Sequence, residues 1–413
     1  MSIEFENLTE TGDGSFSFCS SLRKVTLINL DIAGNRLFEE CRVLQYLSLP
    51  SVTFCGSLMI SNCHLITLLE LPNLSKCESN FLMNSFVLRF EFNSLISIPD
   101  DLFRNSSTIQ EVRMKTVEAI GHNAFTNCTE LFIVDLPNVE VIGDHAFEDC
   151  TSLPSINFPN LVEIGEHSFE GCTKITQAVL NKVASVGNYS FFRCIALESA
   201  NFQELKYCGE SAFHDCHALR SIMTPFLENI SRKSFYNCIE LHRIDLPNVV
   251  KIGDECFAFS GITRINYPKL ITIGDRSFDN CWNLEIVSCN KLESIGKYAF
   301  NNCSKITNPS LNSVLYVDDF AFNDCQNLTK ISSGSLLVLG SSVFSKCQLL
   351  SEVSLQHCQF VGDSCFAGCS NLISVNLPNV VEIDDAAFSN CPFKTLSFQN
   401  LKSIGNSAFS DCY

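Results

Sequence analysis

The chain has 413 residues and a formal net charge of −17 at pH 7, with 45 acidic residues against 28 Lys and Arg residues. This excess of negative charge argues against general nucleic-acid binding, which needs basic side chains to neutralise phosphates, and against attraction to anionic membranes. Hydrophobic residues make up 46% and charged residues 18%. The chain can therefore bury a core and is not of the disordered class.

Large apolar residues recur at a nearly constant interval of 22 residues. Eighteen phenylalanines and Ile60 mark this period from Phe16 to Phe409, and it shortens to 21 residues at three places, Ile60→Phe81, Phe257→Phe278 and Phe388→Phe409. A fixed period of this length predicts a solenoid, in which each repeat is one coil that contacts only its neighbours. It also predicts a single domain over residues 1–413, whose most degenerate part is 71–110.

Each coil has the same internal order of residue types. Residues 131–150 and 153–172 both follow the pattern L-x-x-I-x-L-P-N-L-x-x-I-G-x-x-A/S-F-x-x-C. The first six positions predict a short strand with alternating inward and outward side chains. The second half predicts a short extended piece and a turn on the opposite side of the coil. This leaves room for few or no long helices.

Proline and glycine occupy fixed places in the coil. Pro137 and Pro159 follow the first strand, where no backbone N–H is required. Glycine follows the second apolar segment in 11 of 14 coils from Gly121 to Gly405, and the exceptions are Ser231, Asp318 and Asp384. We expect this position either to need a positive φ or to be crowded by neighbouring backbone.

This pattern closely resembles the BspA-like (TpLRR) class of leucine-rich repeats over essentially the whole chain. The resemblance implies a right-handed leucine-rich-repeat solenoid, mainly β, of about 19 coils. The family is found among surface proteins of bacteria and parasitic protists. It therefore implies a non-enzymatic protein-binding or adhesion role, with a host protein or host cell as the partner.

Sixteen of the 23 cysteines lie three residues after a periodic apolar residue. Stacked residues of neighbouring coils lie at about the 4.8 Å strand spacing, so this column is interpreted as small, buried free thiols. Ser106, Ser260 and Asn84 at the same position favour packing over obligatory pairing. Some disulfides are an alternative that the spacing permits. Metal binding is a further alternative, although no C-x-x-C pair occurs.

Catalytic, cofactor and metal sites are not predicted. The chain has no G-x-S-x-G, H-E-x-x-H, P-loop or G-x-G-x-x-G motif. His145 and His167 hold equivalent places in neighbouring coils beside Asp144 and Glu166. They are interpreted as a solvated pair on an exposed turn, with a metal-ligand role as the alternative.

The outward positions of the first strand carry the predicted partner-binding surface. Solenoids bind through such extended faces. Several basic side chains occur close together on this acidic chain. Polar side chains beside them could form hydrogen bonds with an extended partner. These candidate residues are Arg220, His242, Arg243, Arg264, Asp245 and Asn266. The basic residues could attract an acidic partner segment, or they could simply pair with local carboxylates.

The termini bear on location and assembly. No secretory signal precedes the first coil, and no apolar run is long enough to span a membrane, so the sequence by itself predicts a cytoplasmic chain and the resemblance predicts the cell surface. An intracellular scaffold or regulatory interaction protein is therefore the alternative function. The chain ends in mid-coil at Cys412-Tyr413 without a polar cap. This ending predicts either end-to-end self-association or a truncated gene product.

Overall fold

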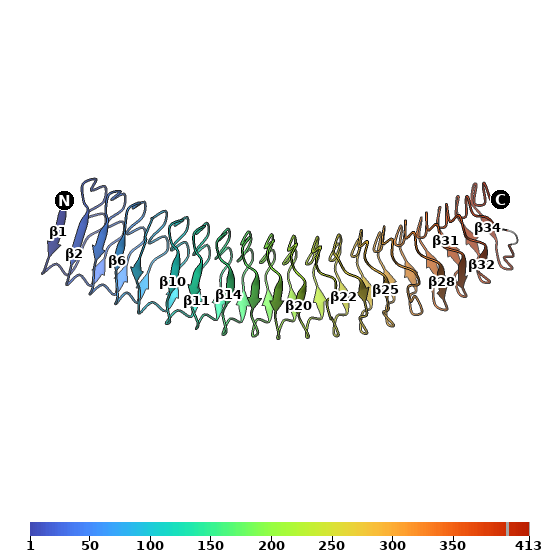
Figure 1. The fold of residues 1–413 in the computed structure, drawn as a ribbon, viewed down its shortest axis with the longest axis horizontal. Coiled ribbons are helices and arrows are strands. Elements are labelled where there is room, and N and C mark those ends of the chain that lie inside the picture. Colours follow the sequence, from blue (N-terminus) through green and yellow to red (C-terminus); the bar gives the residue numbers. More distant parts are fainter. Residues whose placement is uncertain (394–395, 413) are drawn as a thin grey trace. The chain divides into compact units, whose positions relative to one another are not determined.

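The computed structural model describes residues 1–393 and 396–412, and it divides the chain into two compact units, Met1–Gln203 and Glu204–Tyr413. Over the described residues it is a parallel β-solenoid of about 18 turns without a helix, close to the 19 coils expected. Successive coils follow one another in chain order within each unit (Figure 1). The predicted fold class is confirmed. A single domain over residues 1–413 stays a prediction.

Each coil of the N-terminal unit has places for two short strands, and these form separate parallel sheets. The strands of the first column are β1 (Ser2–Phe5), β2 (Lys24–Leu27), β4 (Tyr46–Ser48), β6 (Leu68–Glu70), β8 (Phe90–Glu91), β10 (Glu111–Arg113), β12 (Ile133–Asp135), β14 (Ser155–Asn157), β16 (Gln177–Val179) and β18 (Ser199–Asn201). The second column holds β3 (Ile32–Ala33), β5 (Phe54–Cys55), β7 (Lys76–Cys77), β9 (Ser97–Ile98), β11 (Ala119–Ile120), β13 (Val141–Ile142), β15 (Glu163–Ile164) and β17 (Ser185–Val186).

The C-terminal unit repeats this plan. Its first column consists of β20 (Ser221–Met223), β23 (Arg264–Ile265), β25 (Ile286–Val287), β28 (Lys330–Ser333), β30 (Glu352–Leu355) and β32 (Ser374–Asn376). Its second column consists of β19 (Tyr207–Cys208), β21 (Asn229–Ile230), β22 (Lys251–Ile252), β24 (Thr272–Ile273), β26 (Ser294–Ile295), β27 (Tyr316–Val317), β29 (Val338–Leu339), β31 (Phe360–Val361), β33 (Glu382–Ile383) and β34 (Ser403–Ile404).

The first column is interrupted in both units. In the N-terminal unit one sheet ends at β8 and the next begins at β10, within the stretch 71–110 where the repeat is most degenerate. In the C-terminal unit residues 241–246 form no strand, although they have the L-x-x-I-x-L pattern. The sequence pattern therefore predicts where the first segment of each coil lies, but it does not predict whether that segment forms the backbone hydrogen bonds of a strand.

Stacked phenylalanines fill the interior of the coils. Phe125, Phe147 and Phe169 are fully buried, and their ring centroids are 4.9 and 5.3 Å apart with nearly parallel planes. Burial of side chains of this size is the main favourable term in folding, and ring contacts add to it. The predicted inward position of the periodic phenylalanine is confirmed.

The turn around each phenylalanine contains two residues in the left-handed region. In the coil of Phe147 these residues are His145 (φ 57°) and Asp149 (φ 56°), which lie two positions before and two positions after the phenylalanine. The recurrent glycine has a different reason: a Cβ on Gly187 would lie 2.7 Å from the carbonyl carbon of Gly165 in the preceding coil. Of the two explanations offered by the sequence, backbone crowding is therefore the one that the structure supports.

One coil has a different register from the predicted one. The N–H of Ile60 donates to the carbonyl of Phe81, whereas the N–H of Phe125 donates to the carbonyl of the residue before Phe147. Leu82 therefore occupies the periodic apolar position, and Ser85 takes the place of the cysteine. The prediction that Phe81 and Asn84 hold these positions is wrong, because the backbone hydrogen bonds fix the register and the size of the side chain does not.

Candidate functional site

The predicted partner-binding residues lie on the first-strand column of the C-terminal unit. Arg220 immediately precedes β20 and Arg264 opens β23, while Arg243 lies in the strandless segment 241–246 between them. The pattern of the coil predicts a first strand around each of these residues, and this is wrong for the middle coil. The side chains are nevertheless outward as predicted. We call the following exposed set the basic surface: Arg220, His242, Arg243, Arg264, Asp245 and Asn266.

Local carboxylates neutralise part of the basic surface. Arg243 forms an ion pair with Asp245 at 2.8 Å, and Arg220 lies 3.8 Å from Glu240. These are exposed pairs, which contribute little to stability. No carboxylate among residues 1–393 and 396–412 lies within 4.0 Å of Arg264. Arg264 is therefore the arginine of this surface that forms no ion pair with the described residues.

Apolar side chains border the basic surface. Met223, at the end of β20, is 53% exposed, and Ile286, which pairs in register with Arg264, is 52% exposed. Exposed apolar side chains beside charged ones are typical of the mixed surfaces that bind proteins. This apolar border was not predicted from the sequence.

The cysteine column is buried and hydrogen-bonded. Cys150 Sγ donates to the carbonyl oxygen of Phe125 in the preceding coil at 3.2 Å, and Cys303 donates to Phe278 in the same way at 3.0 Å. Ser85 makes the equivalent bond to the carbonyl of Ile60. All 23 cysteines are free thiols, and all but Cys19 and Cys412 are buried. This confirms the predicted column of small buried side chains.

Burial also removes the chemical reactivity of this column. Loss of solvation raises the pKa of the Cys281 and Cys391 thiols of this column to about 12. The thiolate, which is the nucleophile and metal ligand, is therefore absent near neutral pH. In the part of the chain that the structure describes, no group of three or more His, Cys, Asp or Glu residues is arranged to hold a metal ion.

The two histidines that hold equivalent places do lie together. The rings of His145 and His167 stack with centroids 4.6 Å apart, and Tyr189 continues the stack at 4.8 Å. Each histidine Nδ1 is engaged by the glutamate three residues later, Glu148 or Glu170. The pair is a half-buried surface ladder, and the sequence missed its third member, Tyr189.

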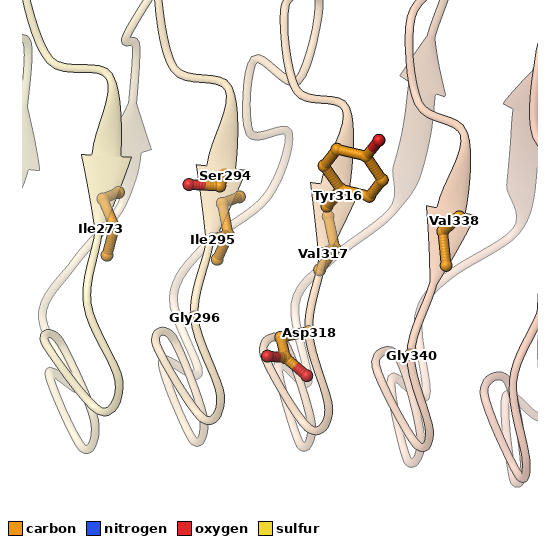
Figure 2. A pocket seen from close by; sticks show the side chains of 9 residues that line it. All are labelled: Ile273, Ser294, Ile295, Gly296, Tyr316, Val317, Asp318, Val338 and Gly340. Carbon is orange, nitrogen blue, oxygen red and sulfur yellow. The ribbon is translucent and has the colours of Figure 1, made fainter.

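A groove that the sequence did not predict lies on the second-strand column of the C-terminal unit. It has a volume of about 410 Å³ and is shown in Figure 2. Its lining residues come from β24, β26, β27 and β29 and the turns after them. They are Ile273, Ser294, Ile295, Gly296, Tyr316, Val317, Asp318, Val338 and Gly340. We call this site the Tyr316 groove.

A second groove lies in the N-terminal unit, at the break between β8 and β10. Its volume is about 760 Å³. Leu88, Arg89 and Glu91 line one side of it, and Glu111 and Arg113 line the other. Charges of both signs and an exposed leucine give this groove no single preferred ligand chemistry.

Comparison with known proteins agrees with this geometry. The BspA type leucine-rich repeat region family, in six copies, matches residues 1–110, 96–220, 228–347 and 293–413. The chain belongs to this family. Among curated proteins no sequence matches it.

The chain is also similar to solved structures, and the first of these has the same fold. A leucine-rich repeat protein from Bacteroides ovatus has a TM-score of 0.61 and 26% identity, over 84% of this chain and 85% of that one. A leucine-rich cell surface protein from Faecalibacterium prausnitzii is 17% identical with a TM-score of 0.41, over 77% and 90% of the two chains. The T. pallidum leucine-rich repeat protein TpLRR is 23% identical with a TM-score of 0.31, over 42% and 78%.

Leucine-rich-repeat domains are generally non-enzymatic scaffolds that bind proteins. Residues 1–393 and 396–412 contain no helix with the length and hydrophobicity of a membrane-spanning segment.

Proposed function

We propose that this BspA-type repeat protein is a non-enzymatic binding module that holds a protein partner on the basic surface. The observation that carries this proposal is the exposed guanidinium of Arg264, which has no carboxylate within 4.0 Å among the described residues of a chain with net charge −17. An acidic segment of a partner would pair with it. Complementary charge chiefly accelerates encounter and sets orientation.

The remaining residues of the basic surface supply hydrogen bonds and apolar contact. Asn266 and Asp245 hold equivalent outward positions in neighbouring coils, and both are exposed. Met223 and Ile286 offer apolar area at its border. An extended acidic segment that also carries apolar side chains fits this combination.

Site-specific photo-crosslinking tests the proposal. We place a photo-reactive amino acid at Asn266 of the full chain, express the protein in its source cells and identify any protein that becomes attached. Asn376, at the equivalent position of a later coil, is the matched control. The proposal expects a product specific to position 266 that is lost when Arg220, Arg243 and Arg264 are replaced by Ala. The same products from both positions, or no effect of the arginine substitutions, would contradict it.

For the biological setting we propose adhesion at the cell surface, as in the family that the repeat resembles. An intracellular scaffold is the second candidate, and the 23 free thiols of the chain favour it, because unpaired cysteines persist in reducing compartments. Biotinylation of intact cells with a membrane-impermeant reagent distinguishes them. Labelling of this protein, with a cytosolic control protein unlabelled, supports adhesion. Labelling only after lysis supports the scaffold.

A further inference from the structure

Two residues of β27 and its following turn depart from their columns. Tyr316 pairs in register with Ser294 on one side and Val338 on the other, so it is the one aromatic side chain among the residues lining the Tyr316 groove. Asp318 stands where the neighbouring coils have Gly296 and Gly340, and it is the one charged residue of the lining. Figure 2 shows Tyr316 and Asp318 on one coil, between the coil with Ser294 and Gly296 and the coil with Val338 and Gly340.

Both side chains are exposed along the groove. Tyr316 lies in β27 and Asp318 directly follows this strand, so their Cα atoms are roughly 6.7 Å apart. Tyr316 is 52% exposed, whereas Ile273, Ile295 and Val317 behind it are each 2% exposed. Gly296 and Gly340 add no side chain beside Asp318, because a Cβ on either glycine would lie only 2.5–3.0 Å from atoms of the coil before it.

The Asp318 carboxylate lacks a direct ion pair in the part of the chain that the structure describes, and it acts on Lys297 at longer range, where it adds to the effect of Asp319 in raising the pKa of that amine. Among the described residues no Lys, Arg or His nitrogen lies within 4.0 Å of it. The nearby Lys297 is engaged by the next residue, because its Nζ lies 3.1 Å from Asp319 Oδ2. Asp318 Oδ1 accepts the N–H of Asp319 at 2.8 Å, which leaves Oδ2 available.

The hydrogen bond that Asp318 accepts from the Asp319 N–H is not special to this groove. Asp384 replaces the same glycine in a later coil and accepts the N–H of Asp385 at 2.9 Å. There the residue two positions earlier is Glu382 instead of an aromatic residue, and the ring that pairs with it in register is the half-buried Phe360 of the preceding coil. The combination of an unpaired carboxylate with an exposed ring therefore distinguishes Asp318 from its counterpart.

We propose that the Tyr316 groove binds a cationic side chain, lysine or arginine, of a partner protein. A cation held within about 6 Å of the Tyr316 ring gains a cation–π attraction while it pairs with the Asp318 carboxylate. A sugar would need several hydrogen-bonding groups, but the lining offers one carboxylate, one phenol and the Ser294 hydroxyl. This site belongs to the second-strand column and is separate from the basic surface, so either proposal can fail without the other.

Fluorine NMR of the full chain tests the proposal. The protein contains eight tyrosines, so 3-fluorotyrosine labelling gives few signals, and the variant Tyr316→Phe assigns the one of interest. The probe is Nα-acetyl-lysine methylamide, and its uncharged analogue is Nα-acetyl-norleucine methylamide. We expect the lysine derivative, and not the norleucine derivative, to shift the Tyr316 signal in a saturable manner.

Two aspartate variants complete the test. Asp318→Gly installs the residue found in most coils and should weaken binding roughly fivefold, the upper range for an exposed ion pair. The matched control Asp384→Gly should leave the affinity unchanged. If Asp318→Gly alters the other tyrosine signals, Asp318→Asn removes the charge with less change in shape. Equal shifts by the two amino-acid derivatives, wild-type affinity without the Asp318 charge, or a shift caused by methyl glucoside instead would overturn the proposal.

Discussion

The cysteine column combines packing with a hydrogen bond. Cys150 is fully buried, and its thiol bonds to a main-chain carbonyl of the preceding coil. A thiol is a weak donor but a good small apolar group, so it satisfies this carbonyl at little cost of desolvation. Ser85 shows that a hydroxyl can take the same place.

Removing a buried thiol should therefore destabilise the protein. We expect Cys150→Ala to lower the free energy of unfolding by about 1–2 kcal/mol, because a small cavity forms and the Phe125 carbonyl loses its partner. Urea unfolding under reducing conditions measures this. The control is Cys412→Ala, at a half-exposed thiol, for which we expect a loss below about 0.5 kcal/mol. Equal losses at the two sites would contradict this account.

The same burial makes stability depend on alkaline pH. Burial raises the pKa of Cys41 to about 11 and that of Cys208 to about 12, whereas an unfolded thiol ionises near pH 9. Between pH 9 and 12 the unfolded chain thus releases protons that the folded chain retains, so stability falls as pH rises. Below pH 9 this effect is absent.

At pH 10 each fully buried thiol should cost roughly 1.4 kcal/mol. We therefore expect the urea midpoint in reducing buffer to change little between pH 7 and 8.5 and to fall steeply by pH 10. A midpoint that is unchanged at pH 10 would show that these thiols do not keep their protons in the folded state.

At the scale of the coil, the recurrent glycine permits close stacking. A Cβ on Gly187 would meet the backbone of the preceding coil at 2.7–2.8 Å, whereas one on Gly334 would meet no atom within 4 Å. The consensus asparagine after proline has a similar linking role, because Asn160 Nδ2 donates to the carbonyl of Pro137 in the preceding coil at 3.1 Å. Successive coils are thus joined by main-chain approach and by side-chain bonds.

These two glycines form a matched pair for mutation. We expect Gly187→Ala to cost about 1–3 kcal/mol, since the backbone must shift to admit the methyl group, and Gly334→Ala to stay within about 0.5 kcal/mol of wild type. Thermal or urea unfolding of both variants checks this. If Gly334→Ala were the more destabilising change, backbone crowding would not be the reason for the recurrent glycine.

The sequence predicts most of the buried positions of the coil, but it does not predict the Tyr316 groove. Period and residue type place Phe147 and Cys150 correctly, because burial in a repeating coil demands the same residue at the same interval. They fail at Leu82, where the neighbouring Phe81 is equally apolar and only backbone hydrogen bonds decide the register. The Tyr316 groove is distinguished by two residues, Tyr316 and Asp318, that differ from their counterparts in the adjacent coils. Stacking residues 296, 318 and 340 at the 22-residue period would have revealed it.

At the scale of the whole molecule, the two proposed sites use the residues that depart from the period. The basic surface and the Tyr316 groove lie on separate strand columns of the C-terminal unit, and they have opposite charge. The repeated phenylalanines and cysteines are buried in the core, where they cannot contact a partner. Function is therefore expected to depend on a few outward side chains, and changes to these should leave the fold intact.

The most direct test of this account is the affinity of the partner found by crosslinking for two charge-matched triple variants. Replacement of Arg220, Arg243 and Arg264 by Ala should weaken binding at least about tenfold and reduce its salt dependence. The control replaces three arginines of the N-terminal unit, Arg36, Arg42 and Arg104, which pair with local carboxylates. Isothermal titration calorimetry should give wild-type affinity for this control. Equal affinity of both variants would contradict the central claim that the basic surface binds the partner.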